Sequence, residues 1–127
     1  MTLEQFQIEN YTLSDGEIMS IAIDYCKQSE TPYFAPTSVR IELSISQAHG
    51  YRKYRKCRAV LTLTGISEIR IFDQQELNGL YSDITITILA SGMYYIAFDP
   101  YDNSNVPNDE DNYVFIAQTI DIQEITP

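Results

Sequence analysis

The sequence has few of the residues on which metal centres and disulfide scaffolds depend. It contains a single histidine, His49, two cysteines, Cys26 and Cys57, and no tryptophan. Sites built from several histidine or cysteine ligands are therefore excluded by count, and a disulfide framework is not expected. With so little cysteine, we expect a protein of the reducing cytoplasm.

Basic residues are also scarce. The chain has 8 Lys and Arg against 18 Asp and Glu, which gives a formal net charge of −10. Nucleic-acid binding needs a basic face, so we expect no nucleic-acid partner, and the acidity instead favours a basic protein. No apolar run approaches the roughly 20 residues of a membrane helix, and the first ten residues do not resemble a signal peptide. We therefore expect no membrane partner.

The length and the residue types favour one domain made of strands. A chain of 127 residues fits a single domain, residues 1–127, with enough buried surface to fold without metal or disulfide. Isoleucine occurs 17 times and tyrosine 10 times. Both residue types suit a pleated, half-buried surface better than a helix.

Apolar and polar residues alternate along several segments, as they do in a strand with one buried face. Between residues 39 and 45 the apolar positions are Val39, Ile41, Leu43 and Ile45, separated by Arg, Glu and Ser. Residues 57–63 and 84–88 alternate in the same way. A period of two is the pattern of a half-buried strand.

These patterns predict an all-β, mainly antiparallel fold with little helix, arranged as a sandwich or a curled meander. Gly65 and the pair Ser91-Gly92 predict hairpin turns, residues 74–80 are a candidate for one helical turn, and the first ten residues are ambiguous. About seven strands are expected, at residues 17–25, 38–46, 56–64, 67–72, 82–89, 93–99 and 113–123.

Residues 51–58 form a basic segment that holds five of the eight basic residues and no acid. Arginine and tyrosine together can pair phosphates and stack on bases, which is one interpretation of the segment. The other is a solvated strand entry whose charges keep a sheet edge from pairing with other chains.

Residues 99–112 form an acidic segment with five acids and no base, between the last two expected strands. Three interpretations are open: a calcium loop, a solvated loop of turn-forming residues, and an acidic docking surface for a basic protein. The spacing of the acids is not that of an EF-hand loop, and the glycine of its turn is missing.

No catalytic motif is present, so we expect a protein that is not an enzyme and requires no cofactor. The chain lacks a P-loop, a dinucleotide fingerprint, a nucleophile elbow and an HExxH motif. His49 is the only conventional catalytic base and precedes Gly50 in an expected turn. Cys26 and Cys57 are expected at strand ends, as small and partly buried residues.

Three stretches share a pattern with one known group of proteins. Residues 14–24, SDGEIMSIAID, form an acidic turn that leads into a strand. Residues 59–80 contain an apolar strand, a Gly-Ile turn, a short strand and a Gln-rich loop, and the third stretch is the final strand pair with its acidic loop. Together they resemble a family of small bacterial β-rich proteins grouped with the immunity proteins of polymorphic toxin systems, although Ser14 stands where that family usually has histidine.

The resemblance implies a non-enzymatic inhibitor that binds and neutralises one cognate toxin. A basic toxin domain would then be the partner, attracted by the acidic segment. Under this hypothesis the partner-binding residues are the charged Asp99, Asp102, Asp109, Glu110 and Asp111 and the aromatic anchors Tyr101 and Tyr113.

Two alternatives stay open at the level of sequence. One is a small-ligand binder or an unrecognised hydrolase, with a pocket in the sheet lined by tyrosines and carboxylates. The other is a subunit of a homo-oligomer that buries a sheet face or pairs edge strands.

Overall fold

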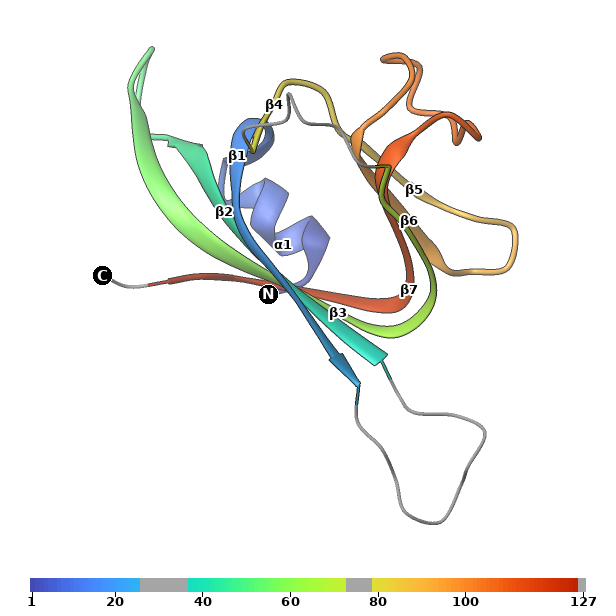
Figure 1. Cartoon of the computed structure of the whole chain (residues 1–127). Coiled ribbons are helices and arrows are strands. Elements are labelled where there is room, and N and C mark those ends of the chain that lie inside the picture. The colour runs from blue at the N-terminus through green and yellow to red at the C-terminus, as the bar shows by residue number, and fades with distance from the viewer. Residues whose placement is uncertain (26–36, 73–78, 126–127) are drawn as a thin grey trace.

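The computed structural model in Figure 1 describes residues 1–25, 37–72 and 79–125. Within these residues the chain forms one short helix and seven strands. In chain order they are α1 (Leu3–Ile8), β1 (Tyr11–Tyr25), β2 (Thr37–Ala48), β3 (Tyr54–Arg70), β4 (Leu80–Tyr81), β5 (Thr85–Ile88), β6 (Tyr94–Asp99) and β7 (Asn112–Glu124).

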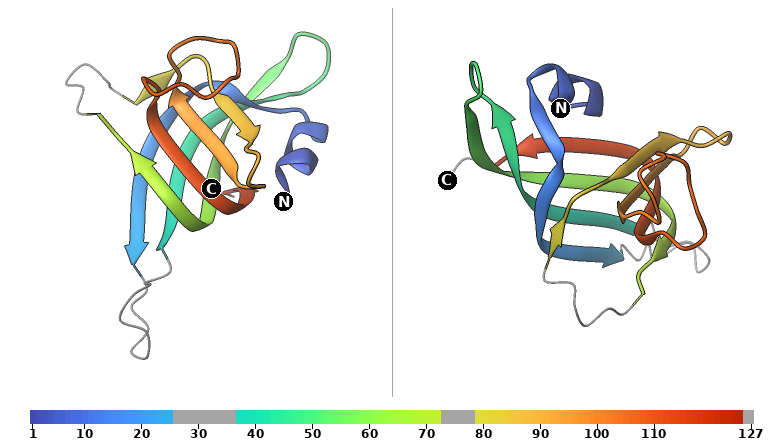
Figure 2. Two further views of the ribbon diagram at one scale, coloured as in Figure 1. Left: turned by 90° about the vertical axis from the view of Figure 1, so that its right-hand side faces the viewer. Right: turned by 90° about the horizontal axis from the view of Figure 1, so that it is seen from above.

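The described strands form a single antiparallel sheet in the order β4-β1-β2-β3-β7-β6-β5. The sheet curls into a half-barrel, which Figure 2 shows from two further sides. Its edge strands, β4 and β5, follow one another in the chain, so residues 82–84 cross the seam between the two edges. The all-β prediction is confirmed, and of the two expected architectures the curled sheet is the one observed.

The predicted alternation places one face of the central strands in the core. Val39, Ile41, Leu43 and Ile45 of β2 lie opposite residues 63, 61, 59 and 57 of β3, and all of these are buried. Directly opposite residues point to the same face of a sheet, so the two strands bury matching rows. These rows form the concave face of the half-barrel, whose core also contains Phe98 and Phe115.

The hairpin predicted at Gly65 is wrong, because the two expected strands are one continuous strand, β3. Gly65 has φ +66°, and the pairing of β3 with β7 slips between Ile66 and Glu68. A glycine in the left-handed region beside a register shift is typical of a β-bulge, which bends a strand without ending it. The turn at Ser91-Gly92 is confirmed: Leu89 donates its N–H to the Met93 carbonyl at 2.8 Å.

The ambiguous first residues form α1, which lies against β1 and β7. The helix begins with a capping box between Thr2 and Gln5, and its one buried side chain, Phe6, stacks on Tyr11 with 4.1 Å between the ring centroids. The strand expected from residue 17 begins earlier, at Tyr11. Its pairing with β2 shifts register between Thr12 and Glu17, where Asp15 adopts φ 53°.

Some expectations fall on residues outside the described ranges. The helical turn considered for residues 74–80 falls mostly on residues outside these ranges. Its last residue, Leu80, is described and belongs to β4. Cys26 also lies outside the described ranges. In the described part of the chain, no helix is long and apolar enough to cross a membrane.

Candidate functional site

The acidic segment is a loop that joins β6 to β7, and most of its side chains are exposed. Asp102, Asp109 and Glu110 are exposed carboxylates, and Tyr101 and Val106 each retain 61% exposure. Of the seven residues predicted to bind a partner, four therefore lie on the loop surface: Tyr101, Asp102, Asp109 and Glu110.

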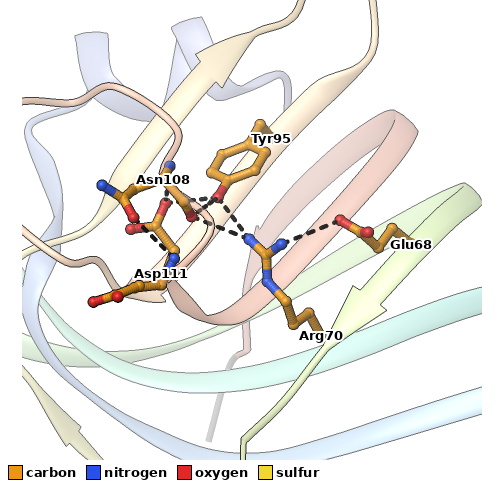
Figure 3. Close-up of polar contacts among 6 residues, drawn as sticks. Glu68, Arg70, Tyr95, Asn108 and Asp111 are labelled. Atoms are coloured by element: carbon orange, nitrogen blue, oxygen red, sulfur yellow. Dashed lines mark hydrogen bonds and ion pairs between the residues drawn. The ribbon is translucent and has the colours of Figure 1, made fainter.

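Asp111 does not contribute to that surface, which corrects the expectation that all five acids of the segment supply exposed charge. Its side chain is buried and accepts three hydrogen bonds, shown in part in Figure 3. Oδ2 accepts from the Tyr95 hydroxyl at 2.6 Å and from the Asn108 N–H at 2.9 Å. Oδ1 accepts from the Tyr101 N–H at 2.7 Å. A buried carboxylate needs such donors, because it would otherwise lose its hydration without compensation.

Arg70 completes the polar cluster beneath the loop. Its Nη2 donates to the Tyr95 hydroxyl at 3.2 Å and to the Asn108 carbonyl at 3.3 Å, and its Nη1 lies 3.9 Å from Glu68 (Figure 3). Burial and the hydrogen bond to Asp111 raise the pKa of Tyr95 to about 12. The cluster links the ends of the loop to β3 and β6.

Short-range hydrogen bonds fix the remainder of the loop. Asp102 Oδ1 accepts from the Ser104 hydroxyl at 2.6 Å and from its N–H at 3.0 Å, and these bonds lower the pKa of Asp102. Asn105 accepts from the Ile86 N–H at 3.1 Å, which ties the loop to β5. The loop therefore presents its charges from a defined conformation.

Tyr113, the second predicted anchor, is half-buried at the start of β7 instead of standing on the loop surface. Its backbone adopts φ 52°, which a bulky residue rarely does. The preceding Asn112 holds this kink, because its Oδ1 accepts from the Tyr113 N–H at 2.9 Å and from the Phe72 N–H at 2.7 Å.

A surface cavity of about 460 Å³ lies at the seam of the half-barrel, where β1 and β4 face the end of β6. We call it the seam cavity. It adjoins the acidic loop, because Asp99 and Pro100 belong to both. The lining residues with side chains relevant to binding are Asp15, Leu80, Tyr81, Asp83, Phe98 and Asp99.

An apolar groove of about 240 Å³ shares part of this lining and extends along the concave face. Tyr81 and Phe98 contact each other edge to face, with 5.2 Å between their centroids. The Tyr81 hydroxyl donates to the Leu13 carbonyl at 2.5 Å, and burial raises its pKa, with a smaller contribution from the charge of Asp15. The groove is lined by Ile18, Ile21, Leu80, Tyr81, Phe98 and Tyr113, together with Gly79 and Asp99.

The alternative of a pocket lined by tyrosines and carboxylates named no residues for such a pocket. Asp99 and Tyr113 were predicted only as parts of the acidic segment, Asp15 only as part of the turn in residues 14–24, and Tyr81 and Asp83 were given no role. These residues come from distant positions in the chain and meet only because the sheet curls until β1 approaches β6. No local pattern in the sequence marks such a meeting.

The basic segment is an exposed hairpin end, in which residues 54–58 pair with β2 alone and β7 joins from Ala59. Arg55 contacts Glu124 at 2.5 Å, and Arg58 contacts Glu42 at 2.6 Å. Within the described residues, two of its five cations are thus paired, which is the behaviour of a solvated strand entry.

The other residues considered for chemistry have ordinary surroundings. His49 is exposed, and Cys57 is buried within β3, where burial raises the pKa of its thiol. Cys57 therefore does not lie at the strand end, where it was expected. Among the described residues, no group of three or more His, Cys, Asp or Glu side chains lies close enough to hold a metal ion.

Comparisons of the chain with protein-family models, curated proteins and solved structures found no match. Function is therefore inferred from the geometry and charge of the acidic loop and the seam cavity.

Proposed function

We propose that this chain is a non-enzymatic binding domain that captures a basic protein through the acidic loop, residues 99–112. The observation that carries the proposal is the group of three exposed carboxylates, Asp102, Asp109 and Glu110, on a loop whose conformation is fixed from beneath by Asp111. A fixed loop loses little conformational freedom on binding, which favours affinity.

The charge of the chain supports the same function. A net charge of −10 creates a field that attracts a basic partner and raises its association rate, while the loop carboxylates supply local pairs that select it. Tyr101 and Val106, the large exposed apolar side chains of the loop, are suited to act as anchors once the partner has docked.

The resemblance to immunity proteins specifies the partner further. We propose a basic toxin domain that the chain binds and neutralises in the cytoplasm. Inhibition of this kind needs only a tight complex and no catalytic group, in keeping with the absence of catalytic motifs from the sequence.

The test compares three tagged proteins in capture from lysates of the source cells, with mass spectrometry of what is retained. The loop variant carries Asp102→Asn, Asp109→Asn and Glu110→Gln. The control variant changes net charge equally at exposed positions outside the loop, through Glu4→Gln, Glu9→Gln and Asp24→Asn.

We expect a basic protein to be retained by the original chain and by the control variant, with at least tenfold lower recovery on the loop variant. The purified pair should then associate more slowly as salt is added. Equal recovery on all three proteins would remove the loop from the binding surface, and equal losses on both variants would mean that only net charge matters.

A further inference from the structure

We propose that the seam cavity binds an arginine side chain of the protein partner, an inference that rests on the proposed function and specifies how the partner is anchored. Three carboxylates line the cavity: Asp15, Asp83 and Asp99. Among the described residues none of them forms an ion pair or accepts a side-chain hydrogen bond. A concave site lined by unpaired charges of one sign concentrates the field that attracts a cation.

The apolar groove that shares part of the cavity lining suits the rest of an arginine side chain. Its lining is mainly apolar and includes the aromatic rings of Tyr81, Phe98 and Tyr113. Arginine has an apolar stem and a planar guanidinium that stacks on aromatic faces and pairs with carboxylates through two parallel bonds. Lysine shares the charge and lacks the plane, so we assign the site to arginine.

The cavity is fixed in shape before any ligand arrives. The Asp15 N–H donates to the Ser82 carbonyl and the Ile18 N–H to the Gly79 carbonyl, both at 2.7 Å, so β4 is held on β1. Gly16 allows the Tyr81 ring to lie close to β1, since a Cβ at Gly16 would stand 2.6 Å from the Tyr81 hydroxyl oxygen. A rigid cavity of this kind limits the entropy that binding would cost.

The location explains why the ligand belongs to a protein partner. Asp99 and Pro100 are the first residues of the acidic loop and also line the seam cavity. A protein that covers the loop therefore meets the opening of the cavity, and a buried, well-packed arginine is a frequent source of binding energy at protein interfaces.

The test uses N-acetyl-arginine N-methylamide as the probe, titrated into the isotope-labelled chain and followed by the amide NMR signals. We expect weak, saturable shifts centred on Gly16, Gly79 and Ser82. The matching citrulline derivative, which is neutral and nearly the same shape, should cause shifts at least five times smaller at equal concentration.

Two variants locate the charge requirement. Asp83→Asn combined with Asp99→Asn should weaken arginine binding at least fivefold, and Asp83→Asn alone should weaken it less. The control, Asp102→Asn with Asp109→Asn, removes the same charge from the loop surface and should leave the affinity within twofold of the original.

Several results would overturn the assignment. Equal shifts from citrulline would show an apolar groove that does not select charge. Shifts centred on residues 101–110 would show general attraction to the loop, and tighter binding of tetramethylammonium would show a site for compact free cations. Any of these results, with partner capture still lost on the loop variant, rejects the seam-cavity site and leaves the proposed function standing.

Discussion

Asp111 shows how one buried side chain determines what an acidic loop can do. Its carboxylate accepts hydrogen bonds from Tyr95, Tyr101 and Asn108. The side chains of its neighbours Asp109 and Glu110 are exposed to solvent. Three consecutive acids thus divide into one that builds the loop and two that are available to a partner.

Replacing this carboxylate is expected to damage the loop and the fold together. Asp111→Ala removes the acceptor of three hydrogen bonds, one from the buried Tyr95 hydroxyl and two from part-buried backbone amides. Hydrogen bonds to a charged group each contribute about 1.5–3 kcal/mol. We expect the free energy of unfolding, measured in urea, to fall by about 3 kcal/mol, with faster hydrogen exchange at the Tyr101 and Asn108 amides.

Asp109→Ala is the matched control, since it removes the same charge from an exposed position next but one in the chain. It should change the free energy of unfolding by no more than about 0.5 kcal/mol. If the two variants were equally stable, the hydrogen bonds of Asp111 would not be what fixes the loop.

Among the strands, β3 carries the bend on which the shape of the sheet depends. It pairs with β2 over residues 54–64 and with β7 from Ala59 onward, and Gly65 lies just before the register shift with β7 between Ile66 and Glu68. A Cβ at Gly65 would stand 2.8 Å from the Cβ of Gln118 on β7. Both the positive φ and the close neighbour therefore require glycine at this position.

Gly65→Ala is expected to destabilise the protein by about 2 kcal/mol or more, because strain in the left-handed region adds to the steric conflict with β7. Gly50→Ala is the control: Gly50 also has a positive φ, but its Cβ would meet nothing within 4 Å. That variant should lose only about 1 kcal/mol in the same denaturation measurement. Equal losses would mean that the contact with Gln118 is relieved at no cost.

At the scale of the whole molecule, the 127 residues carry more negative charge than their ion pairs neutralise. Among the described residues, side-chain cations pair with carboxylates at Arg55, Arg58 and Arg70, against 18 acids in the sequence. Repulsion among the remaining carboxylates destabilises the compact state, and it also supplies the field that is proposed to attract a basic partner.

Raising the ionic strength should therefore stabilise the fold. Between about 0.01 M and 0.15 M salt the screening length falls from about 30 Å to about 8 Å, so repulsion between distant carboxylates weakens. We expect thermal unfolding to shift to a higher temperature with sodium chloride and potassium chloride alike. The variant Glu4→Gln, Glu9→Gln, Asp24→Asn should show a smaller shift, and a fall in unfolding temperature would contradict the repulsion argument.

Local patterns were enough to predict the strand character of β2, β6 and β7 and the buried face of the central sheet. The alternation from Val39 to Ile45 and from Cys57 to Leu63 follows from the geometry of a strand, whose side chains point to opposite faces in turn. The acidity of the loop is equally plain in composition. Each of these features depends on residues that are neighbours in the chain.

Three other features were decided only when the strands assembled. They are the bulge beside Gly65, the burial of Asp111, and the meeting of Asp15, Asp83 and Asp99. A glycine between two apolar runs fits a turn as well as a bulge, and the pairing of β3 with β7 selects between them. Likewise, a carboxylate is buried or exposed according to which donors the fold brings to it. The seam cavity exists because the sheet curls, and that curl is a property of all its strands together.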